Sequence, residues 1–498
     1  MSTPKKSTEM VMAMVSPIGV KRQAFKDKLV EKFKEYDYEV VVIRLSEVLE
    51  PKPCDGDDSF EGTYQKIYRY MSAGNNIRSQ SKDLLAKFAV TQVIAKRQQK
   101  GIPKNPEMTV NRVVYLIDSI KHHAELELLR EVYGDGFYLL GINSGVEDRK
   151  FNLLSKKGAL SQVKARYQVQ HLMDLDACDD VGHGQEVVEV YHKSDYFFGD
   201  VSNEQALNHS VSRFLKLVFN HPYITPTFAE YAMHMAYVAS TKSADMSRQV
   251  GAVVTKESSI LSFGANDVPK AGGGTYWPII ENNGAVSDIS GGRDYTRGIE
   301  ANRSEINQMV SLIQEGLNSR NCKLTTKEIE EILKPAGVLS LTEFGRMLHA
   351  EMDALLDCAK RGIPLEGSCM YVTTFPCHNC AKHIVGSGVK KVVYVEPYPK
   401  SKALGLHNDS IVNLENTNNC ENKVIFQPFI GLGPRYYMAL FSISLSRGAT
   451  KHRKDTDKIS TVKINKTGAE PRLKMFPYSY LGREEAILYE VRANLPTS

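Results

Sequence analysis

Short apolar runs alternate with amphipathic stretches through the first half of the chain. Residues 23–36 have helical spacing through Phe25, Leu29 and Phe33. The apolar runs have the length of strands and are rich in Val, Ile, Leu, Met and Phe; they lie at 10–15, 39–45, 113–118, 137–142 and from 196 on. Strands that alternate with helices predict a parallel, doubly wound α/β sheet.

The pattern changes near residue 222, where Pro222 and Pro226 predict a turn and a domain boundary. We therefore expect a first domain over 1–222 and a second over 223–498. The second starts with a helix near 228–240 and a hairpin near 250–263. The stretch 269–342 is glycine-rich at its start and polar afterwards. It predicts an insertion that serves as a lid, a partner-binding arm or an oligomer contact.

Composition narrows the class of protein. Of 498 residues, 42% are hydrophobic and 24% are charged, as in globular proteins. No window approaches roughly eighteen uninterrupted apolar residues, and the N-terminus has no signal-peptide core, so we expect no membrane span. Eight cysteines are too sparse for a disulfide scaffold, which favours a cytoplasmic protein. The net charge of +5 is small. The basic stretch 447–474 indicates a solvated loop, with a nucleic-acid patch as the alternative.

Four residues in the second half have the spacing of a catalytic metal site. His349 and Glu351 open one helical pattern, and Cys377 and Cys380 open another directly after Pro376. Cysteines three apart on a first helical turn can both face one ion. His349, Cys377 and Cys380 are the predicted ligands of Zn²⁺. They leave a fourth tetrahedral position open, as in catalytic zinc sites.

Glu351 completes this constellation as the predicted catalytic proton shuttle. Residues two apart diverge by roughly 200° inside a helix. His349 and Glu351 can share one centre only if the helix is just beginning there. The pattern H-x-E followed by P-C-x-x-C is the zinc-deaminase signature. His378 is not counted as a ligand, because a fourth protein ligand would close the site.

The second domain resembles the deoxycytidylate deaminases. The resemblance rests on Gln249-Val-Gly-Ala252, Gly264-Ala-Asn266, His349-Ala-Glu351-Met-Asp-Ala354 and Pro376-Cys-His-Asn-Cys-Ala-Lys382. It implies a three-layer α/β/α cytidine-deaminase-like fold, a sugar contact by Asn266 and a homo-oligomer. A nucleotide 5′-phosphate also needs cationic donors. The candidates in the matching segments are Arg248, Lys270, Arg293 and Lys402.

The whole chain resembles a narrower group, the bacterial anti-phage deoxycytidylate (dCTP) deaminases, in which a kinase-like domain precedes the deaminase. Three stretches with this resemblance are Asn266-Asp-Val-Pro-Lys270, Gly292-Arg-Asp-Tyr295 and Gly433-Pro-Arg-Tyr-Tyr437. The resemblance implies that dCTP, and also dCMP, is converted to the deoxyuridine nucleotide and ammonia. Such a reaction would deplete the nucleotides that phage replication needs.

The loop after the first strand lies where a phosphate-binding loop would be. Ser16 replaces the first glycine of the P-loop pattern, and the Gly-Lys-Ser/Thr ending is absent. Ser16, Gly19 and Lys21 are candidates for binding a nucleotide, and Asp118 ends the third strand where a magnesium-binding acid would lie. We expect a P-loop-like domain that binds a regulatory nucleotide or senses a partner such as a small RNA, in preference to an active kinase.

Two other functions fit the same residues. A polynucleotide cytidine or adenosine deaminase would flip a base into the same zinc pocket, and the 447–474 stretch favours it. A non-catalytic nucleotide- or RNA-binding regulator would use zinc for stability alone. Glu351 counts against that regulator, because a structural zinc site needs no such carboxylate.

Overall fold

The computed structural model describes residues 7–49, 60–101, 111–155, 163–177, 179, 183–199, 201, 203–334, 336–341, 343–397, 401–413, 422–455, 457 and 459–494. The chain divides into two compact units. Unit 1 gathers residues 1–231, 413–419 and 428–498, and unit 2 gathers residues 232–412 and 420–427. Both are of mixed α/β type, and each is built on one six-stranded sheet.

Unit 1 has a largely parallel sheet with the strand order β14-β5-β4-β1-β3-β2. Its parallel strands are β1 (Met10–Val15), β2 (Glu39–Arg44), β3 (Val113–Asp118), β4 (Phe137–Ile142) and β5 (Tyr196–Phe198). The five apolar runs of the sequence therefore form the parallel sheet that they predict. β1 lies between β3 and β4 and is buried at every position, as expected for a central parallel strand.

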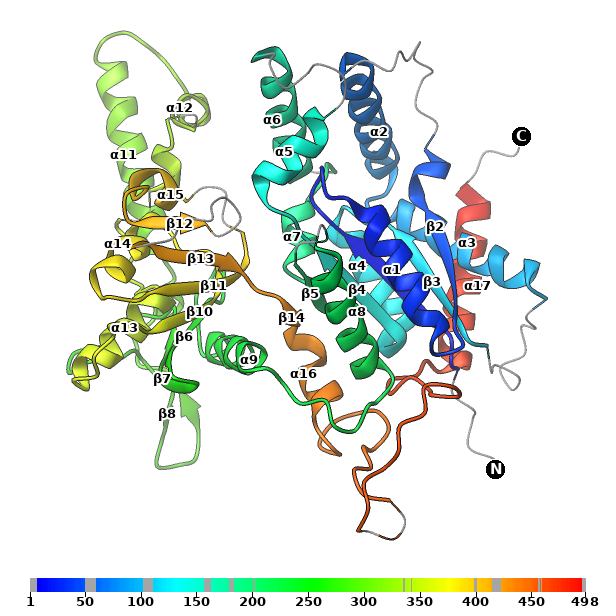
Figure 1. Ribbon diagram of the computed structural model, residues 1–498. Coiled ribbons are helices and arrows are strands. Elements are labelled where there is room, and N and C mark those ends of the chain that lie inside the picture. The colour runs from blue at the N-terminus through cyan, green and yellow to red at the C-terminus, as the bar shows by residue number, and fades with distance from the viewer. Residues whose placement is uncertain are drawn as a thin grey trace. The chain divides into compact units, whose positions relative to one another are not determined.

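Helices connect these strands and cover the sheet (Figure 1). In chain order they are α1 (Arg22–Lys34), α2 (Phe60–Gln80), α3 (Leu84–Gln99), α4 (His123–Tyr133), α5 (Val146–Leu154), α6 (Val163–Ala177), α7 (Val187–Tyr191) and α8 (Glu204–Val218). α1 and α8 pack an apolar face on the sheet, and Phe25, Phe33 and Phe214 are fully buried in the core they form.

The C-terminal segment belongs to unit 1, whereas the sequence pattern placed everything from 223 to 498 in the second domain. β14 (Gly431–Leu432) adds an antiparallel edge strand to β5. α16 (Pro434–Phe441) follows it, and α17 (Pro477–Asn494) packs on α3 (Figure 1). The buried Arg97 of α3 bonds Glu484 of α17 at 2.6 Å and Glu9 beside β1 at 3.2 Å. These contacts join segments that are hundreds of residues apart in the chain.

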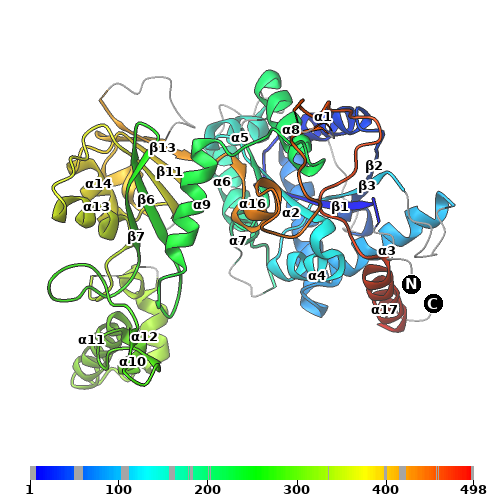
Figure 2. The same cartoon turned by 90° about the horizontal axis from the view of Figure 1, so that it is seen from below.

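Unit 2 has a mixed sheet with the order β12-β13-β11-β10-β6-β7. The strands are β6 (Gly251–Lys256), β7 (Ser259–Ala265), β10 (Cys369–Thr374), β11 (Lys391–Glu396), β12 (Ile411–Asn413) and β13 (Val424–Pro428). β10 and β11 are parallel, and the β6–β7 hairpin is antiparallel. Figure 2 shows α13 (Ala350–Lys360) and α14 (His378–Gly386) on one face and α9 (Phe228–Ser240) on the other.

The described residues of the predicted insertion form a short hairpin, three α-helices and a short 3-10 helix (Val338–Ser340). Its elements are β8 (Ile279–Ile280), β9 (Val286–Ser287), α10 (Asp294–Arg297), α11 (Ala301–Asn318) and α12 (Thr326–Leu333). α11 and α12 share a small core of Ile306, Val310 and Ile329, which are all nearly fully buried. The polar helical segments of the sequence are thus real helices with an apolar core of their own.

Candidate active site

Two helix starts bring three metal-type ligands together. β10 leads into Cys377, the N-cap of α14, and Cys380 lies in the first turn of that helix. His349 is the N-cap of α13. Its Nδ1 atom lies 3.4 Å from Cys377 Sγ and 3.3 Å from Cys380 Sγ. All three ligand atoms lie within 4.8 Å of one another.

These distances fit a tetrahedral zinc ion. Zinc–sulfur bonds of about 2.3 Å and zinc–nitrogen bonds of about 2.0 Å put the two kinds of ligand atom about 3.5 Å apart. Two thiolates and one imidazole are also a donor set that zinc prefers. Three protein ligands leave a fourth position free for another group, which distinguishes catalytic from structural zinc sites.

Contacts within the trio shift the pKa values of its members. A hydrogen bond with Cys380 lowers the pKa of Cys377 to about 4, while the same contact and burial raise the pKa of Cys380. A hydrogen bond with Cys377 raises the pKa of His349 to about 9. Without a metal, the pair of thiols therefore holds one negative charge. A cation between them allows both to ionise, as zinc coordination requires.

Glu351 lies in the first turn of α13, close to the three ligands, with only 4% of its surface exposed. Desolvation raises the pKa of its carboxyl to about 7, although the positive charge of His349 acts in the opposite direction. A carboxyl with a pKa near the working pH can both accept and release a proton. The position and burial of Glu351 thus suit proton transfer.

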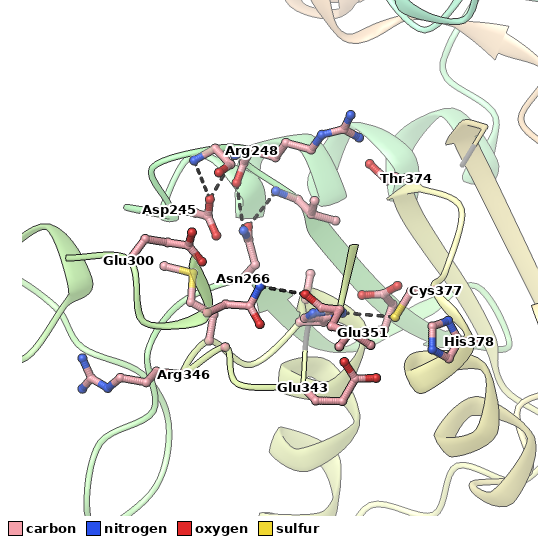
Figure 3. A pocket seen from close by; sticks show the side chains of 18 of the residues that line it. Asp245, Arg248, Asn266, Glu300, Glu343, Arg346, Glu351, Thr374, Cys377 and His378 are labelled. Atoms are coloured by element: carbon pink, nitrogen blue, oxygen red, sulfur yellow. Dashed lines mark hydrogen bonds between the residues drawn. The ribbon is translucent and has the colours of Figure 1, made fainter. Parts of the chain in front are cut away.

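His349, Glu351 and Cys377 line a cavity of about 870 Å³, whereas Cys380 is not one of its lining residues. Figure 3 shows Glu351, Cys377 and His378 at one side of this pocket and Glu300 and Arg346 at the other. The far wall comes from the insertion and the segment that follows it; its residues include Asp294, Glu300, Asn302, Gly337, Leu341, Glu343 and Arg346. The insertion is therefore part of the pocket.

Arg346 links two segments of that wall by hydrogen bonds. It was not predicted from the sequence. Its guanidinium donates to the Asp294 carboxylate at 2.6 Å and to the Gly292 carbonyl at 3.0 Å. The only available signal was its position, three residues before His349. The structure shows that Arg346, like His349, lines the pocket.

Asn266 and Arg248, two of the predicted substrate contacts, both line the pocket. The Asn266 side chain accepts a hydrogen bond from Val250 N at 2.7 Å and donates one to Arg248 O at 2.8 Å. It fixes the segment before β6 against the end of β7. The half-exposed Arg248 guanidinium donates to Glu396 at 2.8 Å.

The other predicted phosphate-binding cations differ in whether they line the pocket. Lys402 lines the pocket, whereas Lys270 is exposed and is not among the lining residues. Arg293 is 5% exposed and bonds the buried Asp267 at 2.9 Å. It is a structural ion-pair partner at the base of the insertion. Of the four predicted cations, the structure thus brings only Arg248 and Lys402 to the pocket.

The loop predicted to bind phosphate in unit 1 lies between β1 and α1. Ser16 is buried and its carbonyl accepts a hydrogen bond from Lys121 Nζ at 3.1 Å, while Lys21 is exposed. Gly19 has φ +89°, and a Cβ there would lie 2.7 Å from the Arg149 carbonyl oxygen. Only glycine therefore fits this turn against α5.

Asp118, at the end of β3, has both carboxylate oxygens paired. Arg22 donates to one oxygen at 2.9 Å, and Lys26 donates to the other at 2.7 Å. A carboxylate held in this way is not open to a magnesium ion.

A second cluster of metal-type ligands lies in unit 1 and consists of His122, His123 and Glu186. Glu186 Oε2 lies 2.5 Å from His123 Nδ1 and 3.5 Å from His122 Nε2. His122 Nδ1 accepts a hydrogen bond from Ala124 N and so caps α4. Its Nε2 must then carry the proton and point it at Glu186. This protonation state does not suit a metal ligand.

Comparison with known proteins identifies unit 2. Residues 226–396 match the family model of the cytidine and deoxycytidylate deaminase zinc-binding region. The deoxycytidylate deaminase of Enterobacteria phage T2 is 32% identical over 175 residues, which are 35% of this chain and 82% of the phage enzyme. The chain belongs to the deoxycytidylate deaminase family. The T4 phage deoxycytidylate deaminase is 31% identical over 176 residues, 35% of this chain and 80% of that enzyme.

Among solved structures, the dCMP deaminase of cyanophage S-TIM5 is 20% identical, with coverage of 41% of this chain and 100% of its own and a TM-score of 0.23. The matched region of this deoxycytidylate deaminase family member contains both ligand segments, and zinc is its cofactor. Among the described residues, no helix is long and apolar enough to cross a membrane.

Proposed function

We propose that this chain deaminates free deoxycytidine nucleotides, converting dCTP, and also dCMP, to the deoxyuridine nucleotide and ammonia. The observation that carries the proposal is the position of Glu351. Its buried carboxyl lies beside His349, Cys377 and Cys380 and lines a pocket large enough for a nucleotide. The names of the phage T2 and T4 relatives supply the deoxycytidylate part of the proposal.

In the proposed reaction, zinc held by the three ligands supplies a Lewis acid that makes water nucleophilic near neutral pH. Glu351 accepts a proton from the attacking water and passes it to N3 of the cytosine ring. It then moves the second proton to the amine at C4, which leaves as ammonia. A carboxyl that is half-protonated near neutral pH suits both transfers.

The pocket suits a free nucleotide that carries phosphate. Arg346 and Arg248 line it but are paired with Asp294 and Glu396. Lys402 is exposed at its edge, so its ammonium group is accessible to a phosphate. We propose that Lys402 contacts the phosphate groups and that Asn266 supports the sugar through the segment it fixes.

Lys402→Gln tests this assignment. A charge-assisted hydrogen bond is worth about 1.5–3 kcal/mol, so KM for dCTP should rise about 10- to 100-fold while kcat changes little. Lys382→Gln is the matched control, because Lys382 is exposed on α14 and does not line the pocket. An unchanged KM in Lys402→Gln would remove this residue from the substrate site.

A mass-spectrometric assay of the purified chain decides between substrate classes. The panel is dCTP, dCMP, CTP, CMP and a cytidine-containing oligonucleotide, each with and without prior zinc chelation. Turnover of dCTP and dCMP that is lost on chelation and restored by zinc is expected. Turnover of the oligonucleotide alone would establish a polynucleotide deaminase instead, and no turnover would favour the non-catalytic regulator.

We propose further that unit 1 is a P-loop-like domain that binds a nucleotide without phosphoryl transfer and regulates the deaminase in defence against phage. Its parallel sheet, the glycine turn at Gly19 and the position of Asp118 support a nucleotide-binding ancestry. The pairing of Asp118 with Arg22 and Lys26 counts against magnesium-dependent catalysis. Expression of the wild type and of Glu351→Gln in phage-challenged bacteria tests the defence role, since protection should require deamination.

A further inference from the structure

A buried carboxylate from α6 contacts the loop after β1 in unit 1. Asp176, in the last turn of α6, is 2% exposed. One of its oxygens accepts a hydrogen bond from Ile18 N at 2.7 Å, and the other accepts one from Lys121 Nζ at 2.7 Å. Proteins bind phosphate groups through the same kinds of contact, with hydrogen bonds donated by loop amides and by ammonium groups.

The surroundings of this carboxylate are rich in positive charge. Arg22, Lys26 and Lys121 meet at the carboxyl ends of β1 and β3, where Arg22 and Lys26 pair with Asp118 and Lys121 pairs with Asp176. The nearby Glu125 carboxylate pairs with Arg78. Burial lowers the pKa of Lys121, and the negative charge of Asp176 acts in the opposite direction by favouring the ammonium form. Without Asp176 the cluster would have two uncompensated positive charges beside a free loop amide.

The helix that supplies Asp176 gives the carboxylate no support of its own. α6 runs from Val163 to Ala177, so Asp176 lies at the negative end of the helix dipole, where a carboxylate is disfavoured. Its position thus depends on the contacts with Ile18 and Lys121. A competing anion would have to take over those two contacts from Asp176.

We infer that Asp176 is an internal substitute for a phosphate group, and that a phosphate-bearing ligand must exchange with it at Ile18 and Lys121 to enter unit 1. The exchange requires no divalent metal, because both oxygens of Asp118 are already paired. Asp176 therefore keeps the loop closed to phosphate until ligand concentration is high enough to displace it. This inference rests on the proposed nucleotide-binding role of unit 1.

Calorimetric titration of the full chain with pyrophosphate, with and without Mg²⁺, tests the exchange. Asp176→Asn keeps the shape of the side chain but removes its charge, and should bind pyrophosphate at least tenfold more tightly than the wild type in the absence of Mg²⁺. The matched control is Asp174→Asn, on the exposed face of the same helix, where the side chain accepts a hydrogen bond from Gln170. It should bind like the wild type.

Two further variants make the result specific. Asp176→Ala should show the same gain if Asp176→Asn unfolds, as judged by thermal melting. The double variant Asp176→Asn/Lys121→Met should lose the gain, which excludes pyrophosphate binding in the zinc pocket. Equal affinity in the wild type and both Asp176 variants would overturn the exchange but leave an anion site in unit 1. No pyrophosphate binding by any folded variant would overturn the anion site as well. The deaminase assay tests the zinc pocket of unit 2, so its result is independent of both of these outcomes.

Discussion

His349 and Glu351 face the same pocket although a single residue separates them. His349 is the N-cap of α13, with an extended backbone (φ −73°, ψ 153°), and the helix begins only at Ala350. Inside a helix, residues two apart would diverge by roughly 200°. The change of backbone conformation at this point lets one side chain reach the metal position while the other remains beside it as a free carboxylate.

Glu351→Gln should abolish proton transfer without loss of zinc. The amide has the shape of the carboxyl but cannot accept and release a proton, so deamination of dCTP and dCMP should fall by about 10²- to 10⁴-fold. Turnover and zinc content measured on the same sample check this. Asp357→Asn, on the same helix, is the matched control, because Asp357 pairs with Lys360 and Arg361 outside the pocket. Glutamine at 351 with full activity would show that another group moves the proton.

The purified chain should hold one zinc ion, and not two. Cys377→Ser should lose it, because the trio would retain only two of its ligands. His123→Ala should keep it, since His122 Nδ1 in the second cluster is engaged by Ala124 N. Elemental analysis of the wild type and both variants gives the count. Two zinc ions per wild-type chain, falling to one in His123→Ala, would establish a second metal site in unit 1.

The features predictable from sequence are those that depend on neighbours along the chain. The apolar runs form the strands of unit 1, and the spacing of His349, Cys377 and Cys380 places all three ligands together. Each strand run, the H-x-E pattern and the P-C-x-x-C pattern lie within a few residues, because helix caps and strand periods are local properties.

The features that sequence did not predict depend on contacts between distant segments. No local pattern shows that the two residues of β14 pair with β5, or that Arg97 binds Glu484 across the α3–α17 interface. Burial of single cations was equally hidden: in the basic 447–474 stretch, Lys451 and Arg472 are only 3% and 2% exposed. These two cations lie inside unit 1, which weakens the case for a nucleic-acid patch there.

Gly264→Ala should disturb the helix that carries Glu351. A Cβ at Gly264 would lie 2.0 Å from the carbonyl oxygen of Ala350 and 2.5 Å from the nitrogen of Ala354, so α13 would have to move away from β7. We expect a loss of about 2–3 kcal/mol in the free energy of unfolding, together with a large loss of deamination.

Gly316→Ala provides the contrast for that prediction. Gly316 lies in α11, and no heavy atom would come within 4 Å of the added Cβ. Alanine should stabilise this helix by about 0.5–1 kcal/mol and leave turnover unchanged. Denaturant unfolding and deaminase assays compare the two variants. If Gly264→Ala proved as stable and active as the wild type, close packing of β7 on α13 would not be required.

The buried Lys451 should make the free energy of unfolding of unit 1 increase with pH in the alkaline range. Burial, helped by the positive charges of Arg472 and Arg453, lowers the pKa of Lys451 to about 8, whereas an unfolded lysine titrates near about 10.4. Between these values the unfolded chain binds more protons than the folded chain. The contribution of Lys451 to the free energy of unfolding is therefore unfavourable below about pH 8 and rises with pH up to about 10.4.

Lys451→Met removes this unfavourable contribution. We expect the variant to be more stable than the wild type by about 1–3 kcal/mol at neutral pH, because each unit of pKa shift corresponds to about 1.4 kcal/mol. The difference should shrink as the pH rises from about 8 to about 10.4, since the wild-type lysine becomes neutral in both states. Urea unfolding across that range measures the difference directly. Lys454→Met, at an exposed position of the same segment, should show no such trend. A constant difference between Lys451→Met and the wild type would mean that packing, and not the buried charge, separates them.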